Sequence, residues 1–395
     1  MSAQRTILGF DRNVFLLGVT SLLNDTSSEI IYPLLPTFLT VVLGGGPATI
    51  GVIEGIAEST ASLLKLVSGW LSDRFRRRKP LVLLGYATAS MARPLVAVTT
   101  APWQVLAIRM TDRVGKGLRS APRDALLAES SHSSTWGRSF GFHRAMDHMG
   151  AVLGPLIAFA LVSGLNEDYR VVFALASIPG VLAVLVVGFG VRERAVEAPA
   201  AVSPALPCGP LPGPLLRFLS VVFVFTLGNS TDAFLLLRAQ TLGVSVATLP
   251  LLWALLHIVK SLTSVPGGSL SDRLGRRRII VLGWLVYAAV YVGFAAATSM
   301  LDICCLFAAY GVFFGLTEGT EKALVTDLVA PADRGAAFGF YHLTVGIAAL
   351  PASLLFAVLW NSSGPALAFA VGAGLAALAA LLFLTLVPAA TQRPS

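Results

Sequence analysis

Charged residues are scarce in this chain. Asp, Glu, Lys and Arg together make up 13% of the 395 residues, whereas hydrophobic residues make up 55%. Soluble domains carry about 25% charged residues, so this chain has too few to cover a surface that faces water. The scarcity excludes an ordinary soluble domain and predicts an integral membrane protein of roughly a dozen helical spans.

Cysteine is almost absent as well. Only Cys208, Cys304 and Cys305 occur, and the last two are adjacent in an apolar run. Three such cysteines cannot make a disulfide framework, so we interpret them as small buried hydrophobic residues. The formal net charge is +8, yet no soluble basic domain carries it. We therefore expect no nucleic-acid partner.

What the sequence does contain is a series of twelve apolar segments. They cover residues 13–42, 48–71, 80–100, 103–121, 138–163, 170–191, 214–239, 246–269, 279–299, 302–325, 335–360 and 364–387. This pattern predicts an all-α membrane protein with twelve transmembrane helices.

A break rich in Pro and Ala, "RERAVEAPAAVSPALPCGPLPGP", separates the first six segments from the last six. Because it has no apolar periodicity, it predicts a linker. We expect an N-terminal six-helix bundle at 1–192, a linker at 193–213 and a C-terminal six-helix bundle at 214–395.

The loops alternate in charge. Those after the second and eighth segments read "DRFRRRK" and "DRLGRRR", whereas those after segments 1, 3, 9 and 11 contain no Lys or Arg. Since Lys and Arg gather on the cytoplasmic side, the even-numbered loops, the linker and both termini are predicted to be cytoplasmic. We expect the protein to lie in a bacterial inner membrane.

The chain also repeats itself. "GWLSDRFRRRK" from Gly69 returns as "GSLSDRLGRRR" from Gly268, at an offset of 199. "GRSFGF" from Gly137 returns as "GAAFGF" from Gly335, and "RDALLAE" from Arg123 aligns with "EKALVTD", both at an offset of 198. Three matches at nearly one offset predict two similar six-helix bundles in tandem.

Two such halves, with a Gly-x-x-x-Asp-Arg-x-Gly-Arg-Arg loop after helices 2 and 8, resemble the major facilitator superfamily of secondary transporters. The resemblance covers essentially the whole chain. It implies that these loops latch the two halves together and release them during alternating access. The first copy has Arg76 where the family has Gly, and the second copy is complete. The gating residues that the resemblance implies are Gly69, Asp73, Arg74, Arg77, Arg78, Gly268, Asp272, Arg273, Arg276 and Arg277.

The stretch "DRVGKGLRSAPRDALLAE" (residues 112–129) holds unusually dense charge. A phosphate-binding loop needs Gly-Lys-Ser/Thr between a strand and a helix, and neither condition holds here. "RVGKG" instead resembles the helix 4 signature of the family, with Lys116 in place of Gln, which implies a role for Arg113 in proton transfer. The charges downstream of it are interpreted either as a solvated cytoplasmic cluster or as gating partners for the arginines near Asp73: Arg119, Arg123, Asp124 and Glu129.

Ionisable residues also lie within the predicted spans, where a charge costs roughly 2.5–3.5 kcal/mol near the bilayer centre. Such residues need a partner, an aqueous cavity or a function. Besides Arg113, the candidates for proton coupling or the substrate cavity are Asp25, Glu29, Glu58, His143, Asp147, Asp232, Lys260 and Glu318, with Glu54, Lys65, Glu321 and Lys322 nearby in sequence.

Three of these candidates suggest specific pairs. Asp147 and Arg113 lie at similar depths, about nine and seven residues from the cytoplasmic side, so we hypothesise a buried pair. Lys260 needs a carboxylate, and Asp232 or Glu318 is the simplest partner. A metal site at His143, Asp147 and His148 is disfavoured, because His148 points away from His143. We therefore expect no metal.

Gly150, Gly154 and Pro155 resemble the antiporter motif of helix 5. Small residues at this spacing also allow close helix contact, which is the simpler interpretation. The trailing glycine pair of the motif is missing, because Ala158 and Phe159 stand there.

The sequence therefore favours a monomeric proton-coupled exporter of a small molecule, in contact with membrane lipids and without a cofactor. Lys65, Lys260 and Arg113 favour an anionic or zwitterionic substrate. Proton-coupled uptake by symport is the alternative within the same fold. A membrane enzyme that modifies lipids through His143, Asp147 and His148 is disfavoured because the second half has no matching polar cluster. The repeated latch loops argue against a channel.

Overall fold

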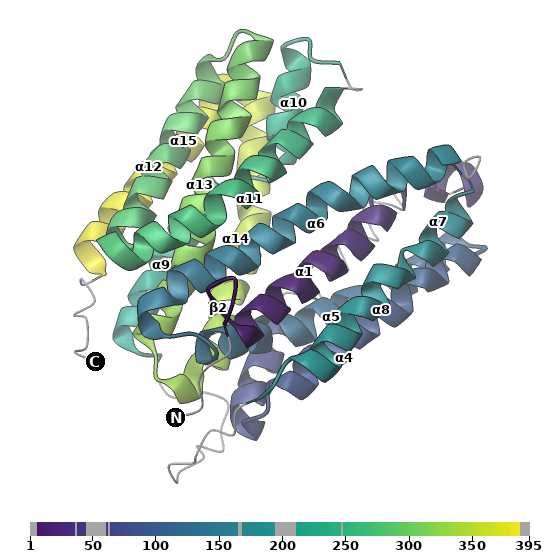
Figure 1. The fold of residues 1–395 in the computed structure, drawn as a ribbon. Coiled ribbons are helices and arrows are strands. Elements are labelled where there is room, and N and C mark those ends of the chain that lie inside the picture. The colour runs from purple at the N-terminus through teal and green to yellow at the C-terminus, as the bar shows by residue number, and fades with distance from the viewer. Residues whose placement is uncertain are drawn as a thin grey trace. The chain divides into compact units, whose positions relative to one another are not determined.

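The computed structural model describes residues 6–35, 38–44, 61, 64–164, 168–193, 211–245 and 248–387. Helices account for most of them (Figure 1). Two short antiparallel strands, β1 (Thr6–Ile7) and β2 (Phe10–Asp11), precede the first long helix. Asp11 caps that helix, since its carboxylate accepts a hydrogen bond from the Asn13 backbone nitrogen.

The helices of the first half follow the predicted segments, and the second segment is described only at 61 and 64–75. The elements are α1 (Arg12–Ile31), η1 (Phe38–Val42), α4 (Lys79–Ala92), η2 (Arg93–Val98), α5 (Pro102–Glu129), η3 (Ser133–Thr135), α6 (Trp136–Gly164), α7 (Tyr169–Leu175), α8 (Ser177–Leu185) and η4 (Val186–Gly190).

The second half begins after the predicted linker, most of which lies outside the described residues, as does Cys208. Its helices are α9 (Gly213–Gly228), α10 (Ala233–Thr241), α11 (Leu249–Leu274), α12 (Arg276–Ala296), α13 (Met300–Leu328), η6 (Pro331–Asp333), α14 (Arg334–Ser363) and α15 (Pro365–Leu386).

Nine helical stretches in the described part are long and apolar enough to cross a membrane. The first, second and fourth predicted segments are not among them. The second is only partly described, and charged side chains interrupt α1 and α5. Helix α5 runs to Glu129, eight residues beyond the predicted end of the fourth segment at residue 121. The seventh segment is one predicted helix but two observed ones, since the chain breaks between α9 and α10 at residues 229–232.

The chain divides into two compact units. Unit 1 comprises residues 1–131, 146–207 and 331–339, and unit 2 comprises 132–145, 208–330 and 340–395. In unit 1, α4 packs against α5 and α1 against α8; in unit 2, α13 packs against α11 and α12, and α15 against α9 and α12. The first turns of α14 therefore belong to unit 1 and the rest of that helix to unit 2. Conversely, the first turns of α6 belong to unit 2 and the rest to unit 1.

Helices α6 and α11 approach each other so closely within unit 2 that only glycine fits at the contact. A Cβ added to Gly268 would lie 2.0 Å from the backbone oxygen of Gly137. Gly69 and Gly335 repeat this arrangement in unit 1, where an added Cβ on Gly69 would lie 2.1 Å from the Gly335 oxygen. The two repeated glycines therefore set the distance between the helices next to each loop.

We expect Gly268→Ala to lower the melting temperature of the purified protein, with a destabilisation of about 1–3 kcal/mol, because the backbone must shift to admit the methyl group. Gly374 is the matched control, since it also lies inside a helix and an added Cβ would meet nothing within 4 Å. Gly374→Ala should leave the melting temperature unchanged or raise it. Equal melting temperatures for Gly268→Ala and wild type would contradict the close contact.

Candidate functional site

The first loop motif binds the N-terminus of a helix. The Asp73 carboxylate accepts hydrogen bonds from the backbone nitrogens of Gly335 at 3.0 Å and Ala336 at 2.6 Å, at the start of α14. A helix N-terminus carries unsatisfied N–H groups and a partial positive charge, so a carboxylate is its natural partner. Asp73 therefore caps α14 across 262 residues of sequence.

Arg78 holds this site together. Its Nη1 lies 2.9 Å from Oδ1 of Asp73, and its Nε lies 2.8 Å from Oε1 of Glu129 at the end of α5. It also donates to the Pro331 backbone oxygen at 3.3 Å. Burial raises the pKa of Asp73 to about 6, even though the Arg78 charge and the two backbone hydrogen bonds lower it.

Glu129 therefore pairs with an arginine near Asp73, as expected, while its role in gating stays a prediction. Of the loop arginines that were expected to act in gating, only some make contacts of this kind. Arg77 is exposed, whereas Arg78 is buried and makes the contacts. Arg74 is exposed too, and its guanidinium lies 5.4 Å from the centre of the Trp70 ring.

The second motif repeats the first. Asp272 accepts hydrogen bonds from the backbone nitrogens of Gly137 at 2.9 Å and Arg138 at 2.8 Å, at the start of α6. Arg276 pairs with Asp272 and, through Nε at 3.0 Å, with Asp327. It also donates to a backbone oxygen, that of Ser133, at 3.1 Å. Arg273, like Arg74, is exposed.

The two loops differ by one residue. Gly275 has a φ of 93° and is followed directly by the pairing arginine, Arg276. Arg76 has a φ of 52° at the same point of the first loop, but one further residue separates it from Arg78. This insertion explains why the repeat offset is 199 before the loop and 198 after it. It also explains why alignment of the motifs points to Arg77.

In the interior of unit 1, α1 brings two predicted acids against α6. The methylene groups of Asp25 and Glu29 face the two motif glycines: an added Cβ on Gly150 would lie 2.9 Å from Cβ of Asp25, and one on Gly154 would lie 2.4 Å from Cβ of Glu29. Close helix contact is thus confirmed for Gly150 and Gly154, and Pro155 lies inside α6. The antiporter role of this motif stays a prediction.

Asp147 lies in the same interior. It is 8% exposed and accepts a hydrogen bond from the Ser21 hydroxyl on α1. Asp25 accepts a hydrogen bond from the side-chain amide of its neighbour Asn24 at 2.7 Å. The like charges of Asp25 and Asp147 repel each other. Two carboxylates from α1 and α6 therefore share one buried region. The predicted Arg113–Asp147 pair stays a prediction. The guanidinium of Arg113 lies over the Tyr32 ring, 5.6 Å from its centre.

A second buried network in unit 1 was not predicted. Nε of Arg93 lies 2.9 Å from Oδ1 of Asp112, and both side chains are 3% exposed. Tyr32 donates its hydroxyl to the other oxygen of Asp112, and Arg93 also donates to the backbone oxygen of Asn24 at 2.9 Å. Arg109 covers the Tyr32 ring, with its guanidinium carbon 3.8 Å from the ring centre. The network ties α1, η2 and α5 together.

The charges that follow Arg113 on α5 are not solvated. Arg119, Arg123 and Asp124 are 5%, 8% and 1% exposed, so the interpretation as a solvated cluster is wrong for these three. Arg123 bonds to Asp124 at 3.1 Å, and Arg119 lies over the Tyr86 ring at 4.7 Å from its centre. They are buried because α5 continues through them and presents them to α4 and the other helices of unit 1.

In unit 2, the break between α9 and α10 carries a charge pair. Nζ of Lys260 on α11 lies 3.9 Å from Oδ2 of Asp232, which confirms the predicted partner. Tyr310 donates to the other Asp232 oxygen at 2.8 Å. The Phe314 ring covers the ammonium group, 3.4 Å from the ring centre, so the cation lies in a largely aromatic environment.

The remaining predicted residues are placed as follows. His143 is 1% exposed and Glu318 is half-buried. Glu54 and Glu58 lie outside the described residues. Within those that are described, no group of three or more His, Cys, Asp or Glu side chains is arranged to hold a metal ion.

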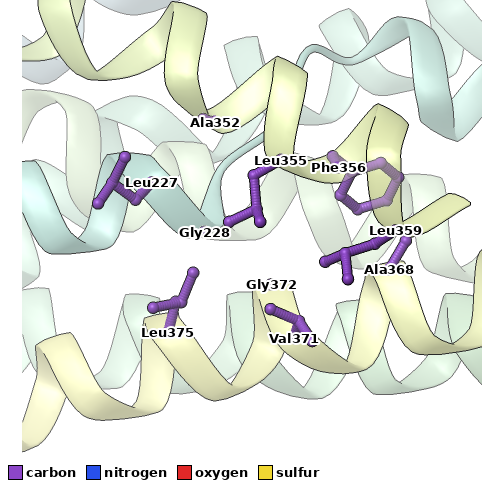
Figure 2. Close-up of a pocket in the computed structure, with 10 residues that line it drawn as sticks. All are labelled: Leu227, Gly228, Ala352, Leu355, Phe356, Leu359, Ala368, Val371, Gly372 and Leu375. Carbon is purple, nitrogen blue, oxygen red and sulfur yellow. The ribbon is translucent and has the colours of Figure 1, made fainter.

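A small hollow lies between α9, α14 and α15 (Figure 2). Its lining consists of Leu227, Gly228, Ala352, Leu355, Phe356, Leu359, Ala368, Val371, Gly372 and Leu375. No polar side chain stands among them, so this hollow offers nothing to recognise a charged molecule.

Two six-helix halves, each with an Asp–Arg loop that caps a distant helix, define a secondary transporter built from tandem repeats. The chain belongs to the Major Facilitator Superfamily, whose family model matches residues 17–237 and 217–395. It is therefore an integral membrane transporter of twelve helices rather than an enzyme.

Relatives agree with this assignment. An uncharacterised MFS-type transporter of Methanocaldococcus jannaschii is 36% identical over 379 residues, which cover 94% of each chain. Among solved structures, the human organic anion transporter MFSD10 superposes with a TM-score of 0.76 at 16% identity, covering 94% of this chain and 99% of that one. The proton:xylose symporter XylE superposes with a TM-score of 0.75 at 15% identity, covering 95% of each. The two structures show the shared fold.

Proposed function

We propose that this transporter exports a small anionic or zwitterionic molecule in exchange for protons. It works as a monomer in a bacterial inner membrane with both termini in the cytoplasm. It uses no cofactor, because the proton gradient supplies the energy. The observation that carries the proposal is the group formed by the half-buried carboxylates of α1 and the buried Asp147 on α6.

Two of these acids, Asp25 and Glu29, suit proton exchange because they lie at membrane depth without a close cation among the described residues. Within the part of the chain that the structure describes, Asp25 and Glu29 form no ion pair, and both are half-buried. A buried carboxylate without a counter-charge favours the protonated form, so such a group takes up a proton when its surroundings exclude water. Asp147, Asp25 and Glu58 are the proposed proton carriers, with Arg113 and His143 as the groups that respond to them.

Lys260 supplies the positive charge for the substrate. Its distance of 3.9 Å from Asp232 is longer than a close ion pair, so an anionic group can compete for the ammonium. The half-buried Glu318 on α13 adds negative charge for the cationic end of a zwitterion. MFSD10 is described as an organic anion transporter, and an anionic substrate would give the two proteins related chemistry.

Inverted membrane vesicles with a respiration-driven proton gradient test the proposal. We would add organic acids, zwitterions, sugars, drugs and metal ions in turn and follow a pH-sensitive dye. A substrate of the exporter should collapse the gradient in wild-type vesicles. A substrate that is taken up by symport should do so only in right-side-out vesicles, and that result would replace export by uptake.

Asp147→Asn is expected to abolish the substrate-induced proton flux, because an amide keeps the shape but cannot carry the proton. Asp168→Asn is the matched control: Asp168 caps α7 from an exposed position, and Asn caps helices equally well. The control should transport like wild type. Unchanged proton flux in Asp147→Asn would remove Asp147 from the mechanism.

A further inference from the structure

Glu321 is a buried acid in the second half to which the proposed export mechanism gives no role. It lies on α13, is 7% exposed, and accepts one hydrogen bond at each carboxylate oxygen. Trp284 on α12 donates from Nε1 to Oε1 at 2.9 Å, and Tyr341 on α14 donates its hydroxyl to Oε2 at 2.7 Å. Both donors are neutral, so neither balances a negative charge.

The surroundings of this carboxyl group are aromatic. Phe225 on α9 stacks on Trp284 with ring centres 4.7 Å apart, and Phe218, also on α9, stacks on Tyr341 at 6.5 Å. Phe383 on α15 contacts the edge of Trp284 at 5.4 Å. A carboxylate in such a pocket has lost its hydration and gained only two hydrogen bonds, so a proton competes well for it.

The charged and titratable groups around Glu321 leave it without a cation. Within the described residues, no Lys, Arg or His lies within ion-pair distance of it. On α13, Glu318 adds a like charge one turn away, and Lys322 is the next residue. On α14, His342 follows Tyr341 and touches its ring edge, and Arg144 of α6 acts on Tyr341. Trp284 of α12 does not titrate.

The two hydrogen-bond donors determine which oxygen of Glu321 can carry a proton. An indole nitrogen is a donor only, whereas a phenol hydroxyl both donates and accepts. A proton on Glu321 therefore goes to Oε2, which then donates to the Tyr341 oxygen, while Trp284 continues to donate to Oε1. The Tyr341 hydrogen turns away from Glu321. No covalent bond other than the new O–H bond changes.

The equivalent position of the first half also holds an ionisable side chain, but one of opposite charge. At the offset of 198, Glu321 corresponds to Arg123, and Trp284 corresponds to Tyr86. Arg123 is buried as well, but it pairs with the neighbouring Asp124. The equivalent site of the second half therefore holds a carboxyl where the first half holds a paired cation.

We propose that Glu321 is a second proton-binding site of the transport cycle and that its protonation weakens the closed latch at Asp73. Tyr341 and Gly335 lie on α14 six residues apart, which is about 9 Å along the axis. A hydrogen bond to a carboxylate is roughly twice as strong as one between neutral groups, so protonation holds α14 less firmly to α13. The first turn of the same helix carries the N–H groups that Asp73 binds.

The proposal rests on proton-coupled transport, but its first test needs no substrate. Infrared difference spectra of the purified protein, recorded from mildly acidic to mildly alkaline pH, should show the C=O band of a buried protonated carboxyl group. Glu321→Gln should lose the part of that band that Glu321 contributes. Asp302→Asn, which changes a half-buried acid in the first turn of the same helix, should keep it. Identical spectra for wild type and Glu321→Gln would overturn the proton site.

The second test follows the latch. Spin labels at Phe75→Cys and Ala332→Cys, both exposed and on opposite sides of the Asp73 contact, report its opening in a background without the native cysteines. Acidification should increase the population with the longer distance, and Glu321→Gln should show that population at every pH. Tyr341→Phe should keep the infrared band but lose the pH response. A wild-type pH response in Tyr341→Phe would overturn the path through α14.

The two proposals fail separately. If the vesicles show no proton flux but Glu321 titrates and moves the latch, then proton-coupled export is wrong and the proton site stands. If proton flux depends on Asp147 but Glu321→Gln leaves the spectra and the distances unchanged, the proton site is wrong and export stands.

Discussion

Arg78→Ala should lower transport strongly and destabilise the protein by about 3–5 kcal/mol, because it removes one partner of a buried ion pair. Arg78 contacts two carboxylates, Asp73 and Glu129, and both would remain without their cation. Burial alone raises the pKa of Asp73, so the loss of Arg78 also favours its protonation. The melting temperature and the proton flux in vesicles measure the two effects.

Arg77→Ala is the control for this experiment. Arg77 is the neighbouring residue, carries the same charge and is exposed, so its removal should change the melting temperature little. A comparable loss in both variants would mean that the loop needs positive charge rather than the bonds of Arg78. The equivalent change in the second half, Arg276→Ala, should behave like Arg78→Ala, since Arg276 also pairs with two carboxylates.

The unpredicted network of unit 1 gives the second large effect. Asp112→Leu should destabilise the protein by about 3–5 kcal/mol, because Arg93 and the Tyr32 hydroxyl lose their common partner while they stay buried. Arg93→Met alone should cost a similar amount for the converse reason. Thermal unfolding of each purified variant provides the measurement.

The double variant Arg93→Met/Asp112→Leu is the informative control. With both charges gone, an apolar pair of similar volume should recover most of the stability, since the desolvation of two ions is no longer needed. A double variant that is as unstable as the sum of the two single variants would show that Arg93 and Asp112 act through separate partners.

The sequence predicted the helices and the loop motifs well, because these depend on apolar runs and on a repeat that can be read directly. The sequence-based predictions reached their limit at the roles of single residues. Arg77 and Arg78 were both expected to act in the first loop, and only the structure shows that Arg78 makes the contacts that Arg276 makes in the second loop. Counting depth along a helix likewise could not show which face a charge lies on.

The buried network of Arg93 and Asp112 illustrates the same limit. Asp112 is the first residue of the charged stretch at 112–129, and Arg93 lies inside an apolar segment just before Pro94. An isolated arginine in a membrane segment was a signal that could have been followed. Its partner could not be named, because the contact depends on how η2 and α5 pack within unit 1.

The positions of the two capped helices in the sequence determine the order in which the two loops can close during synthesis. Asp73 must wait for α14, whose first N–H groups come 262 residues later, so the first loop is left incomplete while most of the chain is made. Asp272 finds its partner at Gly137, already 135 residues behind it. Of these two loops, the one at Asp272 is made later but can close first. The N-terminal half reaches its final form only when α14 leaves the ribosome.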